Sequence, residues 1–404
     1  MTDLFSMDKK TKHFGVPQTI YQGSGCIRVI PDILKAEGWT KVLLVVGPTF
    51  VKLDVFQQLE SMLKAGGIEF KIFSNIQPNP TAEDVEKIGL PMYREMKADV
   101  LLAVGGGSTM DSAKGIAIVG DSDKTLNDIA GVMGTYDPYV PLPWKTYPII
   151  AVPTTCGSGS EVIRNAVISD ASGHKMVPMH DAILPAYAVC DPDLLATLPP
   201  RIAAASGMDA LVQAIEALVS RAATDFSRTM SFRAIELMGP IIVKYYHNRA
   251  ISEYANAMSL GCMYGGFAWN NSFPAQVHGS NHPITEKMDI SHGEACAILL
   301  PWFVEWNGAV CREDFWKVHN LMYPGQAVCY EDFDIPIFVE KLIQLNHDLN
   351  ILNNKTMADY NCTEELCREM TSEFNDKSPF FPRTTSKAQM NDAFIRVMNG
   401  EYAI

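Results

Sequence analysis

Positive charge is scarce in this sequence, which holds 33 lysines and arginines against 46 aspartates and glutamates. The formal net charge is −13, and the basic residues are spread along the chain without forming a block. Nucleic acids and acidic membrane surfaces bind clustered positive charge. We therefore expect no nucleic acid and no membrane as a partner.

Long apolar runs and paired cysteines are also missing. No stretch resembles the roughly 18 apolar residues of a membrane span, and the start, MTDLFSMDKKTKHFG, carries charges where a secretory signal is apolar. The odd number and wide spacing of the cysteines indicate reduced thiols, so we predict a soluble cytoplasmic protein. They stand at positions 26, 156, 190, 262, 296, 311, 329, 362 and 367.

The sequence does contain enough apolar material for large cores, since 47% of its 404 residues are hydrophobic. This length favours two or three domains. Short runs rich in Val, Ile and Leu, bounded by turn residues, are typical of strands buried on both faces of a parallel sheet. They are KVLLVV at 41–46, FKIF at 70–73, DVLLAV at 99–104 and YPIIAV at 147–152.

Beyond Asp191 the pattern becomes helical. In SGMDALVQAIEALVS a broad apolar stripe is formed by Met208, Leu211, Val212, Ile215, Leu218 and Val219. We predict an α/β dinucleotide-binding domain at residues 1–190 and an all-helical domain at 191–404. The cleft between them is the expected active site.

The segment VGGGSTMDSAKG at 104–115 follows the third predicted strand and opens a helix. Its glycines allow the backbone to approach a ligand closely, and a helix N-terminus attracts anions, which suits a pyrophosphate. A tight strand-to-helix turn explains the glycines equally well. Asp111 is either a helix cap or a cofactor contact, and Lys114 is either a phosphate counter-ion or a solvated helix residue.

A second polar loop follows the fourth predicted strand and offers hydroxyl groups beside glycines. Hydroxyls can hydrogen-bond a nucleotide or a nicotinamide, although the loop alone is also explained as a Ser/Thr-rich turn. The hydroxyl residues are Thr154, Thr155, Ser158 and Ser160.

Three histidines, His278, His282 and His292, fall within fifteen residues, and Asp209 and Gln213 lie one turn apart on the preceding helical segment. Imidazole and carboxylate are usual ligands of a catalytic divalent ion. A carboxylate on an apolar helix needs a partner when buried, and we favour a metal over a salt bridge for Asp209. The pattern predicts a metal site.

Taken together, these motifs resemble the iron-containing (group III) alcohol dehydrogenase family over nearly the whole chain. The resemblance implies a Rossmann-like N-terminal domain, NAD(P), one divalent metal (Fe, Mn or Zn) and interconversion of a small primary alcohol and its aldehyde. We expect an aldehyde reductase that forms a homodimer. The matching segments are PNPT at 78–81, GGGSTMDSAK at 105–114, PTTCGSGSEV at 153–162, GMDAL at 207–211 and the run from His278 to Pro301.

The resemblance also implies roles for single residues. Asp209, His278 and His292 match metal ligands, and His282 matches a histidine near the substrate. We interpret His282 as either a proton-relay group or a packing residue. Positions that match cofactor-contacting or cleft-lining residues are Asn79, Gly106, Gly107, Ser108, Asp111, Thr154, Thr155, Asn165 and Lys175.

Gln213 departs from the family, which usually has histidine four residues after the aspartate. The spacing keeps position 213 on the same helix face as Asp209, so Gln213 either ligates the metal or holds a water. An amide oxygen is a weaker and harder ligand than imidazole, which predicts lower affinity for Zn²⁺ and Fe²⁺ and a relative preference for Mn²⁺. A metal-poor nucleotide-binding homologue without turnover is the alternative.

Cofactor preference depends on the residue after the first predicted strand. NAD-preferring relatives commonly carry an aspartate there, and this sequence has Gly47, followed by Pro48 and Thr49. Nothing there repels the 2′-phosphate of NADP, and Thr49 can bond it. We expect both Gly47 and Thr49 to lie at the cofactor, with NADP(H) favoured over NAD(H).

The sequence defines the substrate only as a class. Small aliphatic aldehydes are expected first, and anionic short aldehydes such as semialdehydes or sulfonated ones second. Phe267, Trp269 and Phe273 either line an apolar pocket or belong to the core. Arg164 either meets an anionic aldehyde or joins the domains. Dehydroquinate synthases share the architecture, but the motif set argues against their cyclising lyase reaction.

Overall fold

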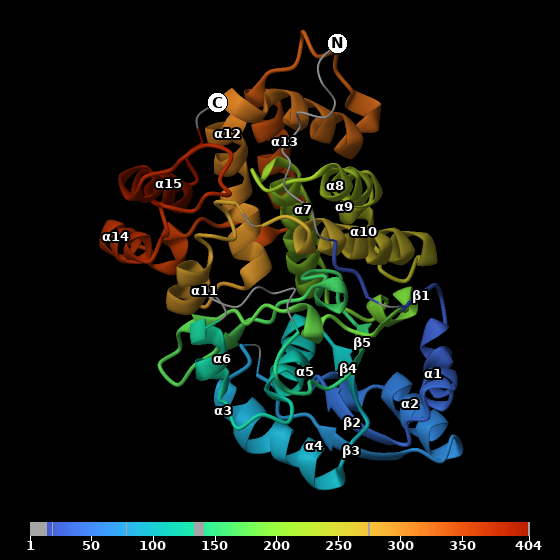
Figure 1. Cartoon of the computed structure of the whole chain (residues 1–404). Coiled ribbons are helices and arrows are strands. Elements are labelled where there is room, and N and C mark those ends of the chain that lie inside the picture. Colours follow the sequence, from blue (N-terminus) through green and yellow to red (C-terminus); the bar gives the residue numbers. More distant parts are fainter. Residues whose placement is uncertain (1–13, 18, 78, 133–140, 274, 403–404) are drawn as a thin grey trace, which may run out of the picture.

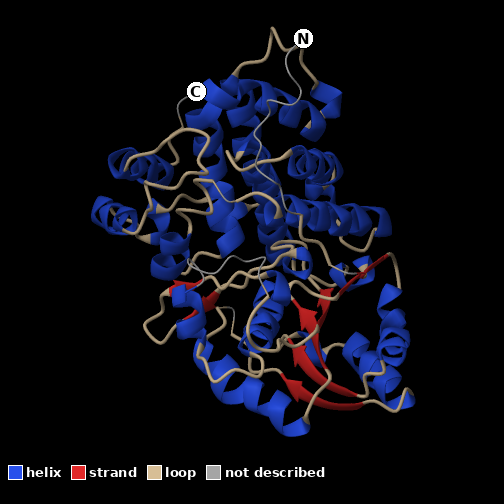
Figure 2. Ribbon diagram, viewed as in Figure 1, coloured by secondary structure: helices blue, strands red, loops and turns tan. Residues whose placement is uncertain are grey.

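The structure is a computed structural model that describes residues 14–17, 19–77, 79–132, 141–273 and 275–402. Figure 1 shows two stacked halves, one built around a β-sheet from the first part of the chain and one built of helices from the second part. Figure 2 shows the same division by secondary structure. The predicted fold class, α/β followed by all-α, is confirmed.

The main sheet has six strands in the order β1-β8-β5-β4-β2-β3, and every pairing is parallel. The four predicted strands are confirmed. Strands β1 and β8 were not predicted, because four-residue strands are too short to show a period. The strands are β1 (Thr19–Gln22), β2 (Lys41–Val46), β3 (Glu69–Phe73), β4 (Val100–Gly105), β5 (Ile149–Pro153) and β8 (Tyr187–Cys190), and a separate antiparallel pair is formed by β6 (Ile168–Ser169) and β7 (Lys175–Met176).

Helices cover both faces of the sheet. Alternate strand residues point to opposite sides, so that Leu43 and Leu101 belong to one apolar core and Leu44 and Leu102 to another. This arrangement explains why the strands are continuous apolar runs. The first core includes residues of α4 (Leu90–Met96) and α5 (Gly107–Val119), and the second includes residues of α1 (Ile30–Glu37) and α2 (Asp54–Ala65).

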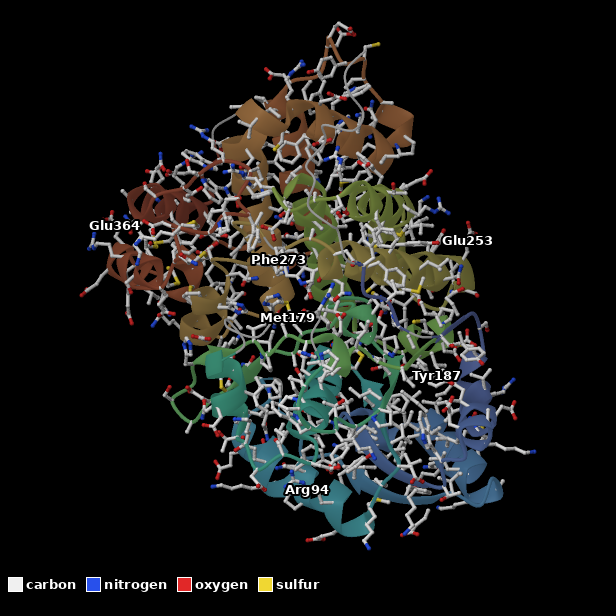
Figure 3. The ribbon with its side chains drawn as sticks, viewed as in Figure 1. Arg94, Met179, Tyr187, Glu253, Phe273 and Glu364 are labelled. Carbon is white, nitrogen blue, oxygen red and sulfur yellow. The ribbon has the colours of Figure 1, made fainter. Side chains whose placement is uncertain are left out.

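Helix α5 is fixed at its C-terminal end by a side chain from α4. Arg94, labelled in Figure 3, donates to the carbonyl oxygens of Gly120 at 2.6 Å and Ser122 at 2.8 Å. Cations stabilise helix C-termini, where carbonyls lack partners within the helix. The N-terminal end of α5 is thereby held at the edge of the sheet that faces the helical half. Two shorter helices of this half are α3 (Ala82–Asp84) and α6 (Leu126–Val132).

The helical half is packed around α7 (Pro200–Val219), which contacts four neighbouring helices. The sequence predicts an apolar stripe, but α7 is buried on all sides, and its polar residues Asp209, Gln213 and Glu216 are buried too. The remaining helices are α8 (Asp225–Met238), α9 (Ile242–His247), α10 (Ser252–Asn270), α11 (His282–Met288), α12 (His292–Met322), α13 (Ile335–Asp348), α14 (Glu364–Ser372) and α15 (Lys387–Asn399).

The length and composition of α7 correct the expectation that no segment is apolar enough to span a membrane. Of the helices in the described residues, it alone is long and apolar enough to cross a membrane, although the sequence analysis found no such segment. Its burial of 83% within the protein is that of a core helix. All nine cysteines lie in the described residues and are free thiols, as predicted.

The order of the strands indicates where a ligand would bind. The chain runs from β2 outward to β3 and then returns to β4 on the other side of β2, so the direction of strand addition reverses between β2 and β4. In open parallel sheets, ligands bind at the carboxyl ends of the strands beside such a switch point. Gly47 and Gly106 follow the ends of these two strands. The boundary at residue 190, where β8 ends, stays a prediction.

Candidate active site

A cavity of about 350 Å³ lies between the two halves and is lined from both. It brings together most of the residues singled out in the sequence, which are Asn79, Gly107, Ser108, Asp111, Thr155, Asn165, Lys175, Asp209, Gln213, His278, His282 and His292. Four others, Gly47, Thr49, Gly106 and Thr154, are not in its wall. They follow the carboxyl ends of β2, β4 and β5.

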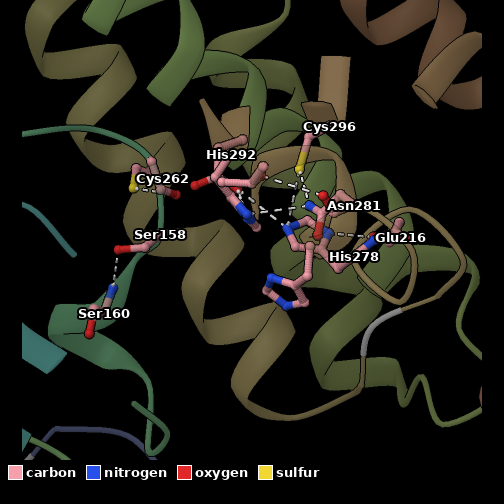
Figure 4. A network of polar contacts seen from close by, with 12 residues as sticks. Ser158, Ser160, Glu216, Cys262, His278, Asn281, His292 and Cys296 are labelled. Carbon is pink, nitrogen blue, oxygen red and sulfur yellow. Dashed lines mark hydrogen bonds and ion pairs between the residues drawn. The ribbon is translucent and has the colours of Figure 1, made fainter. Parts of the chain in front are cut away.

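Four potential metal ligands converge at one end of this cavity. They are Asp209, His278, His292 and Cys296, and one ligand atom from each lies within 4.8 Å of all the others. The Asp209 Oδ1 atom is 3.3 Å from His278 Nε2 and 3.5 Å from His292 Nε2. Figure 4 shows these side chains pointing toward one another, His278 from the loop before α11 and both His292 and Cys296 from α12. The chain thus forms a compact donor set.

Cys296 is the member of this set that the sequence analysis missed. Its Sγ atom is 3.8 Å from His278 Nε2, and it is fully buried in α12. His292 opens α12, and Cys296 follows one turn later on the same face of the helix. That spacing of four was a signal available in the sequence.

Glu216 is a second missed residue, and it fixes the orientation of His278. Its Oε2 atom is 2.5 Å from His278 Nδ1, and its carboxylate also accepts hydrogen bonds from the backbone N–H groups of Val277 and His278. With Nδ1 bonded to a carboxylate, Nε2 is left to face the other donors, which is the usual arrangement around a metal-ligating histidine. Asp209, Gln213 and Glu216 share one face of α7 through the spacing i, i+4, i+7.

The charged forms of the donor side chains stabilise one another. Burial would raise the pKa of the Asp209 carboxyl, but the imidazoles of His292 and His278 lower it well below its ordinary value. Burial would lower the pKa of His292, but Cys296 and Asp209 raise it to about 9. Burial raises and the two imidazoles lower the pKa of the Cys296 thiol, and the net direction is down. A divalent cation would take the place of these protons.

Gln213 provides a test of whether the site fits a cation. Its side chain is 3% exposed, it lines the cavity, and its Nε2 atom has no hydrogen-bond partner. A buried amide N–H without a hydrogen-bond partner lowers the stability of the fold. If the side-chain amide is rotated so that its nitrogen and oxygen exchange places, the oxygen, which is an acceptor, faces the same space. A cation, or a water bound to one, would satisfy that acceptor. Carboxylate, imidazole, thiolate and amide donors together fit a divalent metal.

His282 lies beside the donor set but outside it. It is the first residue of α11, its ring centroid is 5.7 Å from that of His292, and its Nδ1 atom is 3.2 Å from Lys175 Nζ. Burial, followed by His292 and Lys175, lowers the pKa of His282 to about 2, so the ring is neutral. An ammonium can only donate, so Nδ1 accepts and Nε2 carries the proton.

The strand-to-helix turn at 105–107 opens on the opposite side of the cavity. Helix α5 begins at Gly107, and its N-cap Gly106 makes no side-chain cap. A Cβ atom at Gly105 would lie 2.3 Å from Thr109 Oγ1, and one at Gly107 would lie 2.8 Å from Ser158 Oγ. The tight turn therefore accounts for Gly105, and close packing against the second polar loop accounts for Gly107. The helix N-terminus still directs its positive end at the cavity.

The Asp111 and Lys114 side chains are both hydrogen-bonded within the protein. The Asp111 carboxylate is not a helix cap, since it accepts from Ser160 Oγ at 2.8 Å and from the backbone N–H of Val167 at 3.0 Å. Lys114 is neither solvated nor a phosphate counter-ion. It is fully buried and donates to Ser160 Oγ at 2.6 Å and to the Asn165 carbonyl at 2.9 Å. Both side chains tie α5 to the second polar loop.

Arg164 joins the two halves, which was one of its two predicted roles. It is 3% exposed, forms an ion pair with Asp181 at 2.8 Å, and donates to the side chain and backbone of Asn270 in α10. Of the three aromatic candidates, Trp269 lines the cavity and packs edge-on against His278, with a centroid separation of 4.5 Å. Phe267 is buried in a core cluster and Phe273 stacks on Phe380.

Comparison with known proteins finds similarity along most of the chain. The family model described as "Iron-containing alcohol dehydrogenase" matches residues 17–192, and that described as "Fe-containing alcohol dehydrogenase family, C-terminal" matches residues 203–396. Lactaldehyde reductase of Escherichia coli (strain K12) is 31% identical over 83% of this chain and 86% of its own. Long-chain-alcohol dehydrogenase 1 of Geobacillus thermodenitrificans is 30% identical over 88% of each.

Solved structures share the whole architecture. A 1,3-propanediol oxidoreductase superposes with a TM-score of 0.88 at 27% identity, covering 96% of this chain and 100% of the other. The sulfoacetaldehyde reductase from Bifidobacterium kashiwanohense, solved in complex with NAD⁺, has a TM-score of 0.82 at 25% identity and covers 97% of this chain and 100% of its own. The similarity therefore includes both halves.

Proposed function

Because this chain belongs to the iron-containing alcohol dehydrogenase family, we propose that the cavity between its halves is where it acts on its substrate. The chain is an NAD(P)-dependent oxidoreductase that interconverts an alcohol and an aldehyde. We assign aldehyde reduction as its direction and a small aliphatic aldehyde as its substrate. The supporting observation is that a metal-type donor set and a helix N-terminus share one cavity.

In this proposal Asp209, His278 and His292 hold the metal, and Gln213 faces it. When bound, a divalent cation polarises the substrate oxygen and the nicotinamide supplies the hydride. Glu216 keeps the His278 ring oriented, and the burial of Asp209 and His278 limits the access of bulk water to the reacting groups. Retention of a complete donor set favours catalysis over the alternative of a metal-poor nucleotide-binding protein.

His282 and Lys175 are proposed to deliver the proton that the product alcohol needs. The neutral ring carries a proton on Nε2 and accepts from Lys175 Nζ at Nδ1. As Nε2 gives its proton to the substrate oxygen, Lys175 passes one to Nδ1, and the ring stays neutral. Lys175 suits this step because burial lowers the pKa of its ammonium.

The cofactor is proposed to lie along the carboxyl ends of β2, β4 and β5. Gly106, Gly107 and Ser108 at the start of α5 would meet its pyrophosphate, while Gly47 and Thr49 would meet its adenosine ribose. Thr154, Thr155 and Asn165 belong to the second polar loop, and Asn79 and Lys175 complete the nicotinamide side. Asp111 would act there only through Ser160, because its carboxylate is bonded within the protein. Without an acidic residue at position 47, NADP(H) is the proposed preference.

An anionic aldehyde is the second substrate candidate. Lys175 lines the cavity with its ammonium group, and a carboxylate or sulfonate on a short aldehyde would pair with it. One structural relative reduces sulfoacetaldehyde. Arg164 does not support this candidate, because its guanidinium is committed to Asp181 and Asn270. We further propose a cytoplasmic location and a dimer.

The test is aldehyde-dependent oxidation of NADPH and of NADH by the full-length protein, stripped with chelator and then supplied separately with Zn²⁺, Fe²⁺ or Mn²⁺. Restoration of turnover by a metal, with NADPH preferred, supports the proposal. Comparison of butyraldehyde with succinic semialdehyde distinguishes the two substrate classes. Absence of turnover with every metal and both aldehydes contradicts it.

A further inference from the structure

We infer that Cys296 is a metal ligand, and that its thiolate takes the coordination position the family usually gives to the histidine absent at residue 213. This inference rests on the proposal that the cavity holds a divalent cation. It concerns which atoms of this chain bind the cation, and it adds a sulfur donor to a family site otherwise made of one carboxylate and imidazoles.

Three of the six distances between the donor atoms are close to those around a single tetrahedral cation. With metal–nitrogen and metal–oxygen bonds of about 2.0–2.1 Å, neighbouring donors lie about 3.3–3.4 Å apart, and a sulfur at about 2.3 Å lies about 3.6 Å from a nitrogen. The observed separations are 3.3 Å from Asp209 Oδ1 to His278 Nε2, 3.5 Å to His292 Nε2, and 3.8 Å from His278 Nε2 to Cys296 Sγ. The side chains need little movement to close on an ion.

The surroundings of Cys296 differ from those of a cysteine that only fills space. Buried cysteines usually behave as small hydrophobes. Here the sulfur faces two imidazoles and a carboxylate, and the Asn281 side-chain amide donates to it at 2.9 Å. An N–H donor to sulfur stabilises a thiolate and is typical of the groups that surround metal-bound cysteines.

A second, independent observation points to the same centre. The Gln213 side chain, 3% exposed and without a partner for Nε2, lines the same cavity one turn from Asp209. A cation held by Asp209, His278, His292 and Cys296 would not need residue 213 as a ligand, and a further position would stay open to the substrate oxygen or to a water that Gln213 bonds. Loss of the usual histidine would then leave a metal site with four protein donors.

The donor chemistry changes the expected metal. Gln213 by itself predicts a relative preference for Mn²⁺, because an amide oxygen is a hard ligand. A thiolate is soft, and sites with sulfur and imidazole donors favour Zn²⁺ or Fe²⁺ over Mn²⁺. The set of Asp209, Cys296 and two imidazoles also carries two negative charges, which balance a divalent cation. The site should therefore bind zinc more tightly than manganese.

Cobalt absorption tests the inference without any measurement of turnover. The chelator-stripped, full-length protein is titrated with Co²⁺, and bound cobalt is counted by elemental analysis. A thiolate ligand gives an intense near-ultraviolet charge-transfer band that nitrogen and oxygen ligands do not give. We expect one cobalt per chain with this band. Failure to bind cobalt, or binding without the band, overturns the inference.

Variants identify the sulfur. Cys296→Ser should lose the band and bind Zn²⁺ at least about ten-fold more weakly, the lower limit for loss of even an outer-shell partner. Cys311→Ser is the matched control, because Cys311 is also buried in α12 but lies at the kink of that helix, outside the donor set. Cys362→Ser tests the neighbouring pair of thiols at Cys362 and Cys367, whose sulfur atoms are 3.8 Å apart. Both controls should keep the band, and a band lost only with Cys362→Ser contradicts the assignment to Cys296.

A return of histidine at position 213 provides a measurement that does not depend on the spectrum. If Cys296 already fills the position, Gln213→His changes zinc affinity little in the parent protein but restores affinity in Cys296→Ser. This non-additivity is the mark of two side chains serving one position. Equal gains in both backgrounds would overturn the inference. A cobalt band without aldehyde turnover would instead reject only the proposed function.

Discussion

At the scale of single residues, the site depends on a carboxylate that does not line the cavity. Glu216 is fully buried and accepts three hydrogen bonds from the segment that carries His278, two from backbone N–H groups and one from the ring. It is a positioning residue, because it acts on the metal through the orientation and basicity of the imidazole. Replacing Glu216 therefore tests the orientation of the His278 ring without removing a metal ligand.

We predict that Glu216→Gln lowers zinc affinity by roughly 10- to 100-fold, the range for loss of an outer-shell partner. An amide keeps the size of the side chain but removes the charge that favours the Nδ1–H form of His278. The measurement is competition for Zn²⁺ with a chromophoric chelator, with Glu305→Gln in the same half of the molecule as the control. Unchanged affinity in Glu216→Gln would show that the carboxylate serves only packing.

Position 47 is expected to decide between the two nicotinamide cofactors. Gly47→Asp places a carboxylate at the end of β2, where it would repel a 2′-phosphate, and should raise KM for NADPH at least about ten-fold, which is about 1.4 kcal/mol. A Cβ atom there lies 3.3 Å from Thr109 Oγ1, so a purely steric effect must be separated from charge. Gly47→Asn is the matched control. Equal losses in the two variants would show that size alone matters.

At the scale of elements, the site is built where two helices meet almost backbone to backbone. Gly293, next to His292 in the first turn of α12, faces α7, and a Cβ atom there would lie 1.9 Å from the Ala205 carbonyl oxygen. This carbonyl oxygen belongs to the backbone of a packed helix, so it cannot move aside as a flexible side chain can. The glycine therefore sets the distance between the helices that carry Asp209 and His292.

Gly293→Ala should consequently separate α7 from α12, weaken zinc binding and lower stability by about 1–3 kcal/mol, the usual cost of overpacking. Gly265→Ala is the control, since a Cβ there finds its nearest atom, the Ala210 carbonyl oxygen, at 3.4 Å. Urea unfolding and zinc competition measure the two effects. Gly293→Ala with parental zinc affinity would contradict a role for this close contact in the site.

At the scale of the whole molecule, a bound cation would link segments that are far apart in the chain. Asp209 belongs to α7, His278 to the loop after α10, and His292 and Cys296 to α12. A ligand that binds only the folded state stabilises it by mass action, by about 2.7 kcal/mol at a hundred times the dissociation constant. Metal should therefore act on the stability of the protein as well as on its chemistry.

For a chain of this length we predict that zinc at a hundred times its dissociation constant raises Tm by roughly 3 °C, given about 2 cal/mol/K of unfolding entropy per residue. Asp209→Ala should abolish the increase and aldehyde turnover while leaving NADPH binding largely intact, because Asp209 lies on the helical side of the cavity. Scanning calorimetry with and without Zn²⁺ measures the shift. A shift that persists in Asp209→Ala would place the stabilising metal elsewhere.

The sequence by itself determined the elements that follow from local patterns. Continuous apolar runs identified the four central strands, because strands buried on both faces need apolar residues at every position. The spacing of Asp209, His278 and His292 identified the metal region, and the fold class and family followed from motifs in order. Two short strands were missed, since β1 and β8 have only four residues each.

Only the tertiary structure decided what depends on contacts between distant segments. Lys114 and Arg164 have side chains that suit solvent or an anion. Both are nevertheless buried, and they donate hydrogen bonds to distant segments of the same chain. Cys296 shares a helix face with His292 and Glu216 shares one with Asp209, but they acquire their roles only because α7, α12 and the loop before α11 bring them to His278. Local sequence sets which residues share a helix face, but the packing of helices sets which faces meet.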